Sequence, residues 1–173
     1  MTRQDAIVIA DSSVLVNFLA VDRVDLLTAL PCRFVVTNHV AEEITYAYPD
    51  RYERFKDSLR SGWIEMISVD DPDEVELFKE LTSERRLGNG ECSAIAVASH
   101  RGYSLAIDDK RAMKRARALD RSLKILSTKD IIIDCIERGI LEVHVADAIK
   151  AEWERDHKFT LNFVSFQDIL LRK

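Results

Sequence analysis

Carboxylates stand at four separated places in this chain of 173 residues, each next to an apolar segment. Two short apolar runs end directly in acid, and two helix starts carry an acid behind a turn. These positions are Asp11, Asp108 with Asp109, Glu42 with Glu43, and Glu91. Carboxylates brought close together repel and raise one another's pKa, and a bound cation removes that conflict. A set of carboxylates without His or Cys suits Mg²⁺ or Mn²⁺ better than zinc.

The segments that carry these acids predict strands alternating with helices. Apolar runs at 7–10, 34–37 and 104–107 are typical of strands buried on both faces, and further strands are predicted at 63–69 and 123–126. Helical spacing follows each of them, as in 111–119 and 128–136. The alternation predicts an α/β fold with a mainly parallel central sheet. Because ligands bind where the carboxyl ends of parallel strands line one edge, we expect the four acidic positions to converge there.

Cysteines and histidines support no rival metal or redox chemistry. Cys32, Cys92 and Cys135 lie far apart among apolar neighbours, which predicts reduced, buried thiols. There is no CxxC or HxxxH motif, so a zinc site has little support. The motifs GxSxG, GxGxxG and the phosphate-binding GxxxxGK are absent as well, and Gly88-Asn89-Gly90 is interpreted as a turn that leads into a helix.

Four segments taken together resemble the PIN-domain family of metal-dependent nucleases. They are Ile7–Val16 (IVIADSSVLV), Val36–Ile44 (VTNHVAEEI), Leu87–Ala98 (LGNGECSAIAVA) and Ser104–Ala112 (SLAIDDKRA). Their order matches the family, and the resemblance spans residues 7–130. It implies a three-layer α/β/α sandwich and Mg²⁺- or Mn²⁺-dependent cleavage of RNA by an activated water. Many bacterial and archaeal relatives are VapC-type toxins that a small antitoxin neutralises.

The resemblance assigns the family's four acidic roles by position. The candidate catalytic residues are Asp11, Glu43, Glu91, Asp108 and Asp109, and all of them except Glu43 are candidate metal ligands. Ser13 resembles the hydroxyl residue that supports the first Asp. The toxins more usually have Thr-x-Asp at the fourth site, which would align with Asp109, so this chain resembles a less characterised branch. The choice between Asp108 and Asp109 stays open at this point, whereas Glu43 is favoured over Glu42.

The whole-chain charge of −5 conceals a basic stretch. Residues 81–129 hold eleven basic and five acidic side chains, whereas residues 1–80 hold eight basic and sixteen acidic ones. Positions 110, 114, 117 and 121 follow one helical stripe directly after a candidate metal ligand. We expect these cations to contact RNA phosphates rather than to form only a solvated face. The candidate contacts are Lys110, Arg111, Lys114, Arg115 and Arg117.

Three other functions use similar residues. A receiver-like phospho-acceptor switch needs paired acids after its first strand, but Ser12 and Ser13 follow Asp11 here. A phosphatase with an aspartate nucleophile needs DxD, and Ser13 occupies the second position. A PIN-like fold that binds RNA or protein without catalysis is the third alternative, which the intact acids disfavour.

The motifs lie within residues 1–140, which we predict to be a PIN-like nuclease domain. Residues 141–173 are predicted to be a C-terminal helical extension packed on that domain. Candidate partners are an RNA substrate, an antitoxin protein and a second copy of the chain. No apolar run approaches the ~20 residues of a membrane span, and no signal peptide is recognised, so we expect a cytoplasmic protein without a membrane partner.

Overall fold

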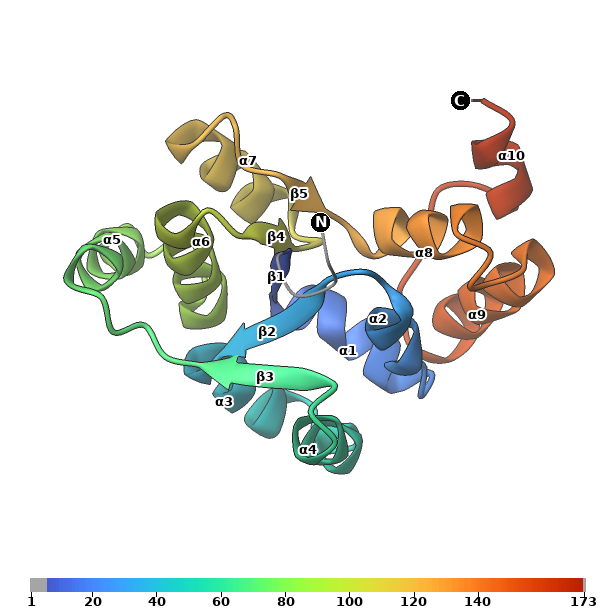
Figure 1. Cartoon of the computed structure of the whole chain (residues 1–173), viewed down its shortest axis with the longest axis horizontal. Coiled ribbons are helices and arrows are strands. Elements are labelled where there is room, and N and C mark those ends of the chain that lie inside the picture. Colours follow the sequence, from blue (N-terminus) through green and yellow to red (C-terminus); the bar gives the residue numbers. More distant parts are fainter. Residues whose placement is uncertain (1–5, 173) are drawn as a thin grey trace.

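A computed structural model describes residues 6–172 and contains one sheet of five parallel strands, in the order β3-β2-β1-β4-β5 (Figure 1). The strands are β1 (Ile7–Ala10), β2 (Arg33–Thr37), β3 (Ile64–Ile67), β4 (Ser104–Ala106) and β5 (Ile125–Leu126). The central strand is β1, which aligns Val8 with Phe34 of β2 and Ser104 of β4. The carboxyl ends of β1, β2 and β4 therefore lie at one edge of the sheet, as predicted.

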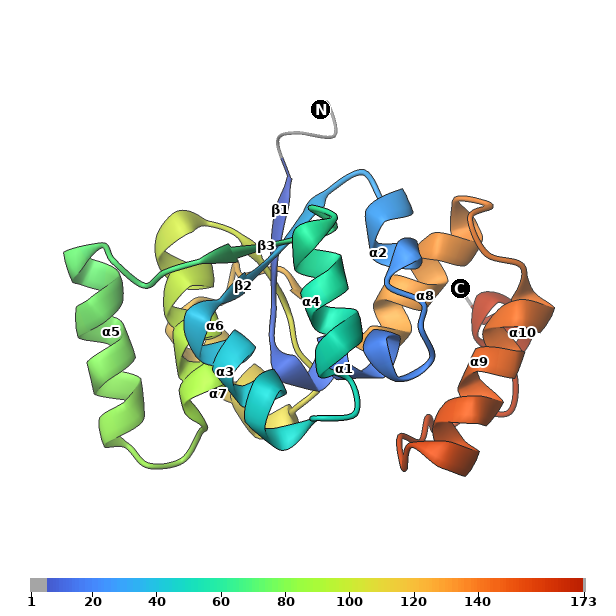
Figure 2. The ribbon, with the colours of Figure 1, turned by 90° about the horizontal axis from the view of Figure 1, so that it is seen from below.

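Helices connect the strands and cover both faces of the sheet. They are α1 (Ser12–Ala20), α2 (Asp25–Ala29), α3 (Asn38–Ala47), α4 (Tyr52–Arg60), α5 (Pro72–Ser83), α6 (Asn89–Arg101), α7 (Lys110–Leu119), α8 (Thr128–Glu137), α9 (Val143–Asp156) and α10 (Phe166–Leu170). In Figure 2, α5 and α6 lie on the side of the sheet opposite to α2 and α8. The expected α/β/α sandwich with a central parallel sheet is confirmed.

The hydrophobic core consists of two clusters, one on each face of the sheet. Val8 and Ala10 belong to the cluster that packs under α1, α2, α8 and α9, whereas Ile9 belongs to the cluster under α5, α6 and α7. Successive side chains of a strand point to opposite faces, so one apolar tetrapeptide contributes to both layers. This burial on both faces explains why the central strands read as continuous apolar runs.

One detail of the predicted basic stripe is wrong. Arg121 lies beyond α7, because the helix ends at Leu119 and Asp120 has extended backbone with φ −139°. The Asp120 carboxylate accepts hydrogen bonds from the amide and the hydroxyl of Ser122 at 2.8 and 2.6 Å. This local side-chain turn competes with further helix formation, so the stripe stops one turn earlier than its spacing suggested.

A buried tryptophan holds α9 to the sandwich. Trp153 of α9 is fully buried, and its Nε1 donates to the carbonyl oxygen of Asn17 in α1 at 2.8 Å. Its ring also meets Phe18 and Phe159 edge-on, with centroids 6.1 and 5.3 Å apart. Among residues 6–172, no helix combines the length and the apolar character that a membrane crossing requires.

Candidate active site

Asp11 follows β1 directly and caps the N-terminus of α1. Its Oδ2 accepts a hydrogen bond from the Ser13 amide at 3.0 Å. Its Oδ1 is buried and has no hydrogen-bond partner among the described residues. Burial raises the pKa of Asp11 to about 7, and the charges of Glu91 and Glu43 push the pKa in the same direction. The buried strand thus delivers a carboxylate with one free oxygen to the sheet edge.

Glu43 reaches the same edge from α3, the helix that follows β2. Thr37 at the end of β2 starts this helix, because its Oγ1 accepts from the Val40 amide at 3.1 Å. Glu43 Oε2 is buried without a hydrogen-bond partner among the described residues, whereas Glu42 is exposed. The structure therefore places Glu43, and not Glu42, beside the other acids.

Glu91 lies in the first turn of α6, where its Oε2 accepts from the Gly88 amide at 2.9 Å. Burial raises the pKa of Glu91 against the opposing effect of that hydrogen bond, and the charges of Asp109 and Glu43 raise it further. A buried contact of 2.7 Å between Thr37 Oγ1 and Ser93 Oγ ties the end of β2 to the same helix.

Gly90 is a site residue that the sequence did not reveal, since the Gly-Asn-Gly stretch was interpreted only as a turn. A Cβ atom at position 90 would lie 2.2 Å from Glu43 Oε2, which is far inside van der Waals contact. A Cβ at Gly88 would meet carboxylate oxygens of Glu43 and Glu91 at 3.9 Å, an ordinary contact distance. Glycine at position 90 is therefore what allows the Glu43 carboxylate to lie against the start of α6.

The two adjacent aspartates after β4 face different partners. Asp108 accepts hydrogen bonds from the Thr128 amide at 2.9 Å, from the Thr128 hydroxyl at 2.5 Å and from Asn17 Nδ2 at 3.1 Å. Its own amide donates to Ser13 Oγ at 3.0 Å. Burial raises the pKa of Asp108, and these hydrogen bonds oppose the rise. Asp108 thus joins the end of β4 to α1 and α8 with both of its carboxylate oxygens engaged.

Asp109 caps α7, and its Oδ1 accepts from the amides of Arg111 and Ala112 at 2.9 Å each. Its charge raises the pKa of Glu91, which lies in the first turn of α6. We call Asp11, Glu43, Glu91 and Asp109 the edge cluster. They come from four elements that are distant in the sequence and meet at the carboxyl edge of the sheet.

The donor set of the edge cluster fits a hard divalent cation. Asp11 Oδ1 and Glu43 Oε2 are buried oxygens without a hydrogen bond, and burial penalises the charge of such groups unless a cation compensates it. All four donors are carboxylates, the ligand type that Mg²⁺ and Mn²⁺ prefer. Within the described part of the chain, however, no three ligand atoms of these acids lie within 4.8 Å of one another.

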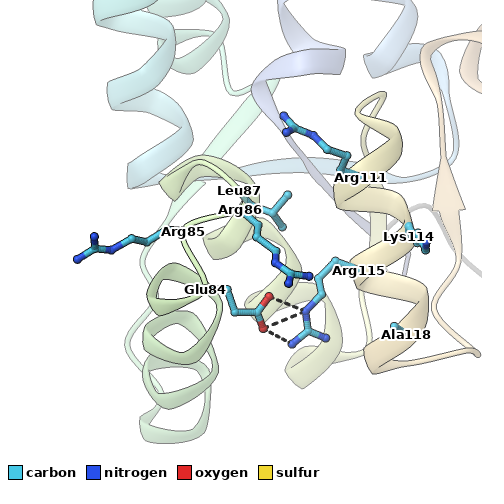
Figure 3. Close-up of a pocket in the computed structure, with 8 residues that line it drawn as sticks. All are labelled: Glu84, Arg85, Arg86, Leu87, Arg111, Lys114, Arg115 and Ala118. Atoms are coloured by element: carbon cyan, nitrogen blue, oxygen red, sulfur yellow. Dashed lines mark hydrogen bonds and ion pairs between the residues drawn. The ribbon is translucent and has the colours of Figure 1, made fainter.

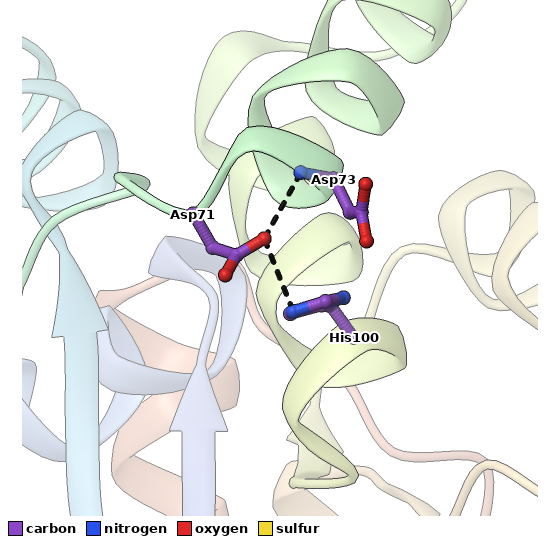
Figure 4. A group of neighbouring side chains, drawn as sticks. All are labelled: Asp71, Asp73 and His100. Atoms are coloured by element: carbon purple, nitrogen blue, oxygen red, sulfur yellow. Dashed lines mark hydrogen bonds and ion pairs between the residues drawn. The ribbon is translucent and has the colours of Figure 1, made fainter.

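A second group of ligand-type side chains does meet that distance limit (Figure 4). We call Asp71, Asp73 and His100 the remote cluster, since Glu91 and His100 lie at opposite ends of α6. Asp71 caps α5, and its Oδ1 accepts from the Asp73 amide at 3.0 Å and lies 3.2 Å from His100 Nε2. No local pattern in the sequence links Asp71 and Asp73 to His100, because His100 belongs to α6.

A basic groove of about 560 Å³ lies between the end of α5 and α7 (Figure 3). Of the predicted phosphate contacts, it is lined by Arg111, Lys114 and Arg115, whereas the exposed Lys110 and Arg117 lie outside it. Arg115 is already paired with Glu84, at 2.5 Å from Nη2 to Oε1.

The loop between α5 and α6 adds two arginines that the sequence analysis missed. Arg86 points toward the groove, and Arg85, which has φ 52°, points away from α7 (Figure 3). Arg111 connects the groove to the edge cluster, because it lines the groove and follows Asp109 by two residues.

Comparisons with known proteins agree with this architecture. A family model described as a PIN domain (DUF3368) matches residues 7–155. No curated protein matches the chain in sequence.

Several solved structures share the fold at low sequence identity. A PilT N-terminus domain protein, SSO1118, from the hyperthermophilic archaeon Sulfolobus solfataricus is 16% identical with a TM-score of 0.52, over 76% of this chain and 94% of that chain. PAE2754 from Pyrobaculum aerophilum is 14% identical with a TM-score of 0.53, over 76% and 90%. VapBC2 from Rickettsia felis, solved with a DNA fragment from its promoter, is 15% identical with a TM-score of 0.50, over 70% and 98%.

Proposed function

Because this chain belongs to the PIN-domain family, we propose that it is an endoribonuclease that uses Mg²⁺ or Mn²⁺ at the edge cluster. The observation that carries the proposal is the pair of buried, unpartnered oxygens, Asp11 Oδ1 and Glu43 Oε2, which face a shared edge with Glu91 and Asp109. A divalent ion bound there would supply an activated water and would neutralise charge on the phosphate.

The protein's own groups would hold and orient that centre. Asp11, Glu43, Glu91 and Asp109 would be the carboxylates next to the ion. Asp108 would act as a positioning residue, since Thr128 and Asn17 occupy its oxygens. Ser13 would link the ends of β1 and β4, because its amide donates to Asp11 and its hydroxyl accepts from the Asp108 amide.

RNA would approach along the basic groove. We assign backbone phosphate contacts there to Arg111, Lys114 and Arg86, whereas Glu84 already compensates the charge of Arg115. Such contacts would bind RNA without reading its sequence. Lys110 and Arg117, exposed on other parts of α7, would contribute to the wider positive field.

Cleavage of RNA by the purified protein in Mg²⁺ or Mn²⁺ tests the proposal. We expect Asp11→Asn to lower the rate by at least about 1,000-fold, and EDTA to abolish cleavage. Asp71→Asn is the matched control, because it removes a helix-capping carboxylate of the remote cluster. Equal rates for wild type and Asp11→Asn, or cleavage that survives EDTA, would overturn the proposal. If the wild type binds RNA but does not cleave it, the catalytically silent binding module is supported instead.

A second pair of variants separates the two adjacent aspartates. We expect Asp109→Asn to remove most activity, by about 100-fold or more, because the helix-capping bonds of Asp109 occupy only its Oδ1 and its charge acts on Glu91. We expect Asp108→Asn to act chiefly on stability, at about 1 to 3 kcal/mol, because it disturbs buried hydrogen bonds to Thr128 and Asn17. Cleavage rates and urea unfolding of both variants decide; the reverse pattern would make Asp108 the ligand.

An antitoxin partner and a toxin role extend the proposal. The support is the likeness in fold to VapBC2, together with the family match. Induced expression of the chain should then arrest bacterial growth, and Asp11→Asn should relieve the arrest. Light scattering tests the related proposal of a homodimer.

We place this activity in the cytoplasm, where RNA and reduced cysteines are both found, since Cys32, Cys92 and Cys135 form no disulfide within residues 6–172. We also propose that residues 1–140 form the nuclease domain and that 141–173 are an extension packed on it, through Trp153.

A further inference from the structure

A second depression adjoins the edge cluster on the side of the C-terminal segment. It has a volume of about 340 Å³. We call it the C-terminal cavity, and it is lined by Ser13, Val16, Asn17, Tyr48, Arg51, Asp108, Asp109, His157, Lys158 and Phe159. Asp109 lines this cavity, and Arg111, two residues later, lines the basic groove. Both depressions therefore adjoin the same end of α7.

Arg51 is the most informative residue of the cavity wall. Its side chain is only 13% exposed, and its Nε is buried without a hydrogen-bond partner among the described residues. The nearest carboxylate, Asp50 Oδ2, lies 3.5 Å away on a side chain that is 68% exposed. A buried guanidinium donor with so weak a partner fits a site that receives an oxyanion.

The neighbours of Arg51 hold it in place without neutralising its charge. The guanidinium lies over the ring of Tyr48, 5.1 Å from its centroid, and Nη2 is 3.4 Å from His157 Nδ1. His157 follows α9 directly, and its amide donates to the carbonyl oxygen of Trp153 at 3.0 Å. The buried Trp153 thus fixes the position of the cavity wall.

Lys158 adds a second cation to this wall. It is exposed, and its backbone is in the left-handed region with φ 55°, where glycine is the usual residue. The next amide, that of Phe159, returns to the carbonyl oxygen of Trp153 at 3.2 Å. A side chain at this position projects from a fixed turn beside Asp108 and Asp109.

From this geometry we infer that the C-terminal cavity binds a nucleotide of single-stranded RNA next to the cleaved bond, with Arg51 and Lys158 on its phosphate. The inference rests on the proposed function and extends it. The basic groove would hold the RNA on one side of the edge cluster and the C-terminal cavity would hold it on the other. Contacts on both sides of the reacting phosphate are what an enzyme needs in order to cut within a strand.

Binding of a fluorescent 12-nucleotide single-stranded RNA tests the inference. Fluorescence anisotropy is measured in Mg²⁺ with Asp11→Asn as the background, so that no RNA is cut. Lys158→Gly removes the charge and suits the left-handed backbone, and Arg51→Gln removes the second cation. We expect each to weaken binding by about 5- to 10-fold and to lower the slope of log K against log salt by about 0.7 per lost contact. Arg138→Gln, which breaks an ion pair with Asp134 at the end of α8, is the control that should change neither quantity.

The outcomes separate this inference from the proposed function. Unchanged affinity and salt slope in folded Lys158→Gly would overturn the inference, even if the wild type cleaves RNA. Binding of RNA that depends on Lys158, in a protein that cleaves nothing, would support the cavity and overturn the nuclease. Binding of poly-glutamate that depends on Lys158, without binding of RNA, would overturn RNA as the occupant. Arg51→Gln alone could loosen the C-terminal segment, so Lys158→Gly is the decisive variant.

Discussion

The edge cluster and the remote cluster lie at opposite ends of α6, and both contain carboxylates. They differ in how closely their ligand atoms are grouped and in how deeply their side chains are buried. In the remote cluster, three ligand atoms come within 4.8 Å of one another. Its side chains are partly or largely exposed, and Asp71 already has the Asp73 amide and His100 as partners. In the edge cluster the ligand atoms are less tightly grouped, but two carboxylate oxygens are buried without a hydrogen-bond partner in the described part of the chain.

From this difference we expect uncompensated burial of a carboxylate to be a better sign of a metal site than closeness of the ligand atoms. An exposed cap keeps most of its hydration, so its charge costs little and needs no cation. A buried carboxylate pays a desolvation penalty, which the raised pKa of Asp11 expresses. A fold tolerates that penalty where function requires it. Four experiments test this contrast between the two clusters.

The largest effect is expected when one first-turn acid is removed from each cluster. Glu91 lies in the first turn of α6 and Asp73 in the first turn of α5, so the two substitutions are matched in helix position. We expect Glu91→Gln to slow RNA cleavage by about 1,000-fold, because the carboxylate charge next to Asp109 is lost. Asp73→Asn should stay within about 2-fold of wild type. A comparable loss in both variants would remove the distinction between the clusters.

Stabilisation by a metal ion should depend on the edge cluster alone. At Mn²⁺ concentrations of about 100 times Kd, binding to the folded state should add about 2.7 kcal/mol, or roughly 5 °C in Tm. Asp11→Asn should abolish this rise, and Asp71→Asn should keep it. The measurement is thermal unfolding with and without Mn²⁺, reversed by EDTA. A rise that disappears only in Asp71→Asn would transfer the metal site to the remote cluster.

The two glycines before and within α6 offer a finer test of the same site. A methyl group at position 90 would displace the flexible end of Glu43, whereas one at position 88 would make ordinary contacts. We therefore expect Gly90→Ala to lower the cleavage rate by about 10-fold without unfolding the protein, since alanine favours the helix. Gly88→Ala should cleave at nearly the wild-type rate. Equal rates in the two variants would show that the position of Glu43 does not matter.

The smallest effect is a dependence of stability on pH in the metal-free protein. The pKa of Asp11 rises from the usual value of 3.8 to about 7 on folding, so the protonated form is favoured in the folded state. Its contribution to stability is complete below pH 3.8 and is lost as pH rises through about 7. Between pH 5.5 and 6.5 the loss should be about 1 kcal/mol.

Urea unfolding of wild type and Asp11→Asn in EDTA isolates this contribution. Other groups contribute equally to both proteins, including groups that titrate in the opposite sense. One of them is Glu74: burial acts to raise its pKa, but the Arg101 side chain lowers it below the usual value. The difference in free energy of unfolding between the two proteins should therefore fall with pH over this window. A constant difference would show that the buried Asp11 carboxylate does not carry the desolvation penalty.

Much of the fold could be predicted because its signals are local. The run Ile7–Ala10 followed by Asp11 already contained a strand, its end and the cap of the next helix. The helix at 128–136 needed only its apolar spacing and its capping residues. The predicted strand at 123–126 was too long, since only Ile125 and Leu126 pair with β4. The length of an edge strand depends on how many of its residues pair with the neighbouring strand. A pattern within 123–126 carries no information about that neighbour.

The sequence alone was enough for the order of strands and helices along the chain, for the sheet edge near which the acids lie, and for the type of side chain gathered there. Hydrophobic patterning and acids at strand ends suffice for this, because both act over a few residues. Only the tertiary structure showed that Asp108 and Asp109 have different surroundings, since the hydrogen-bond partners of Asp108 come from α1 and α8. It alone showed the closeness of Gly90 to Glu43 and the cavity that joins Arg51 to Lys158. These contacts join residues that only the packing of helices on the sheet brings together, so no pattern along the chain encodes them.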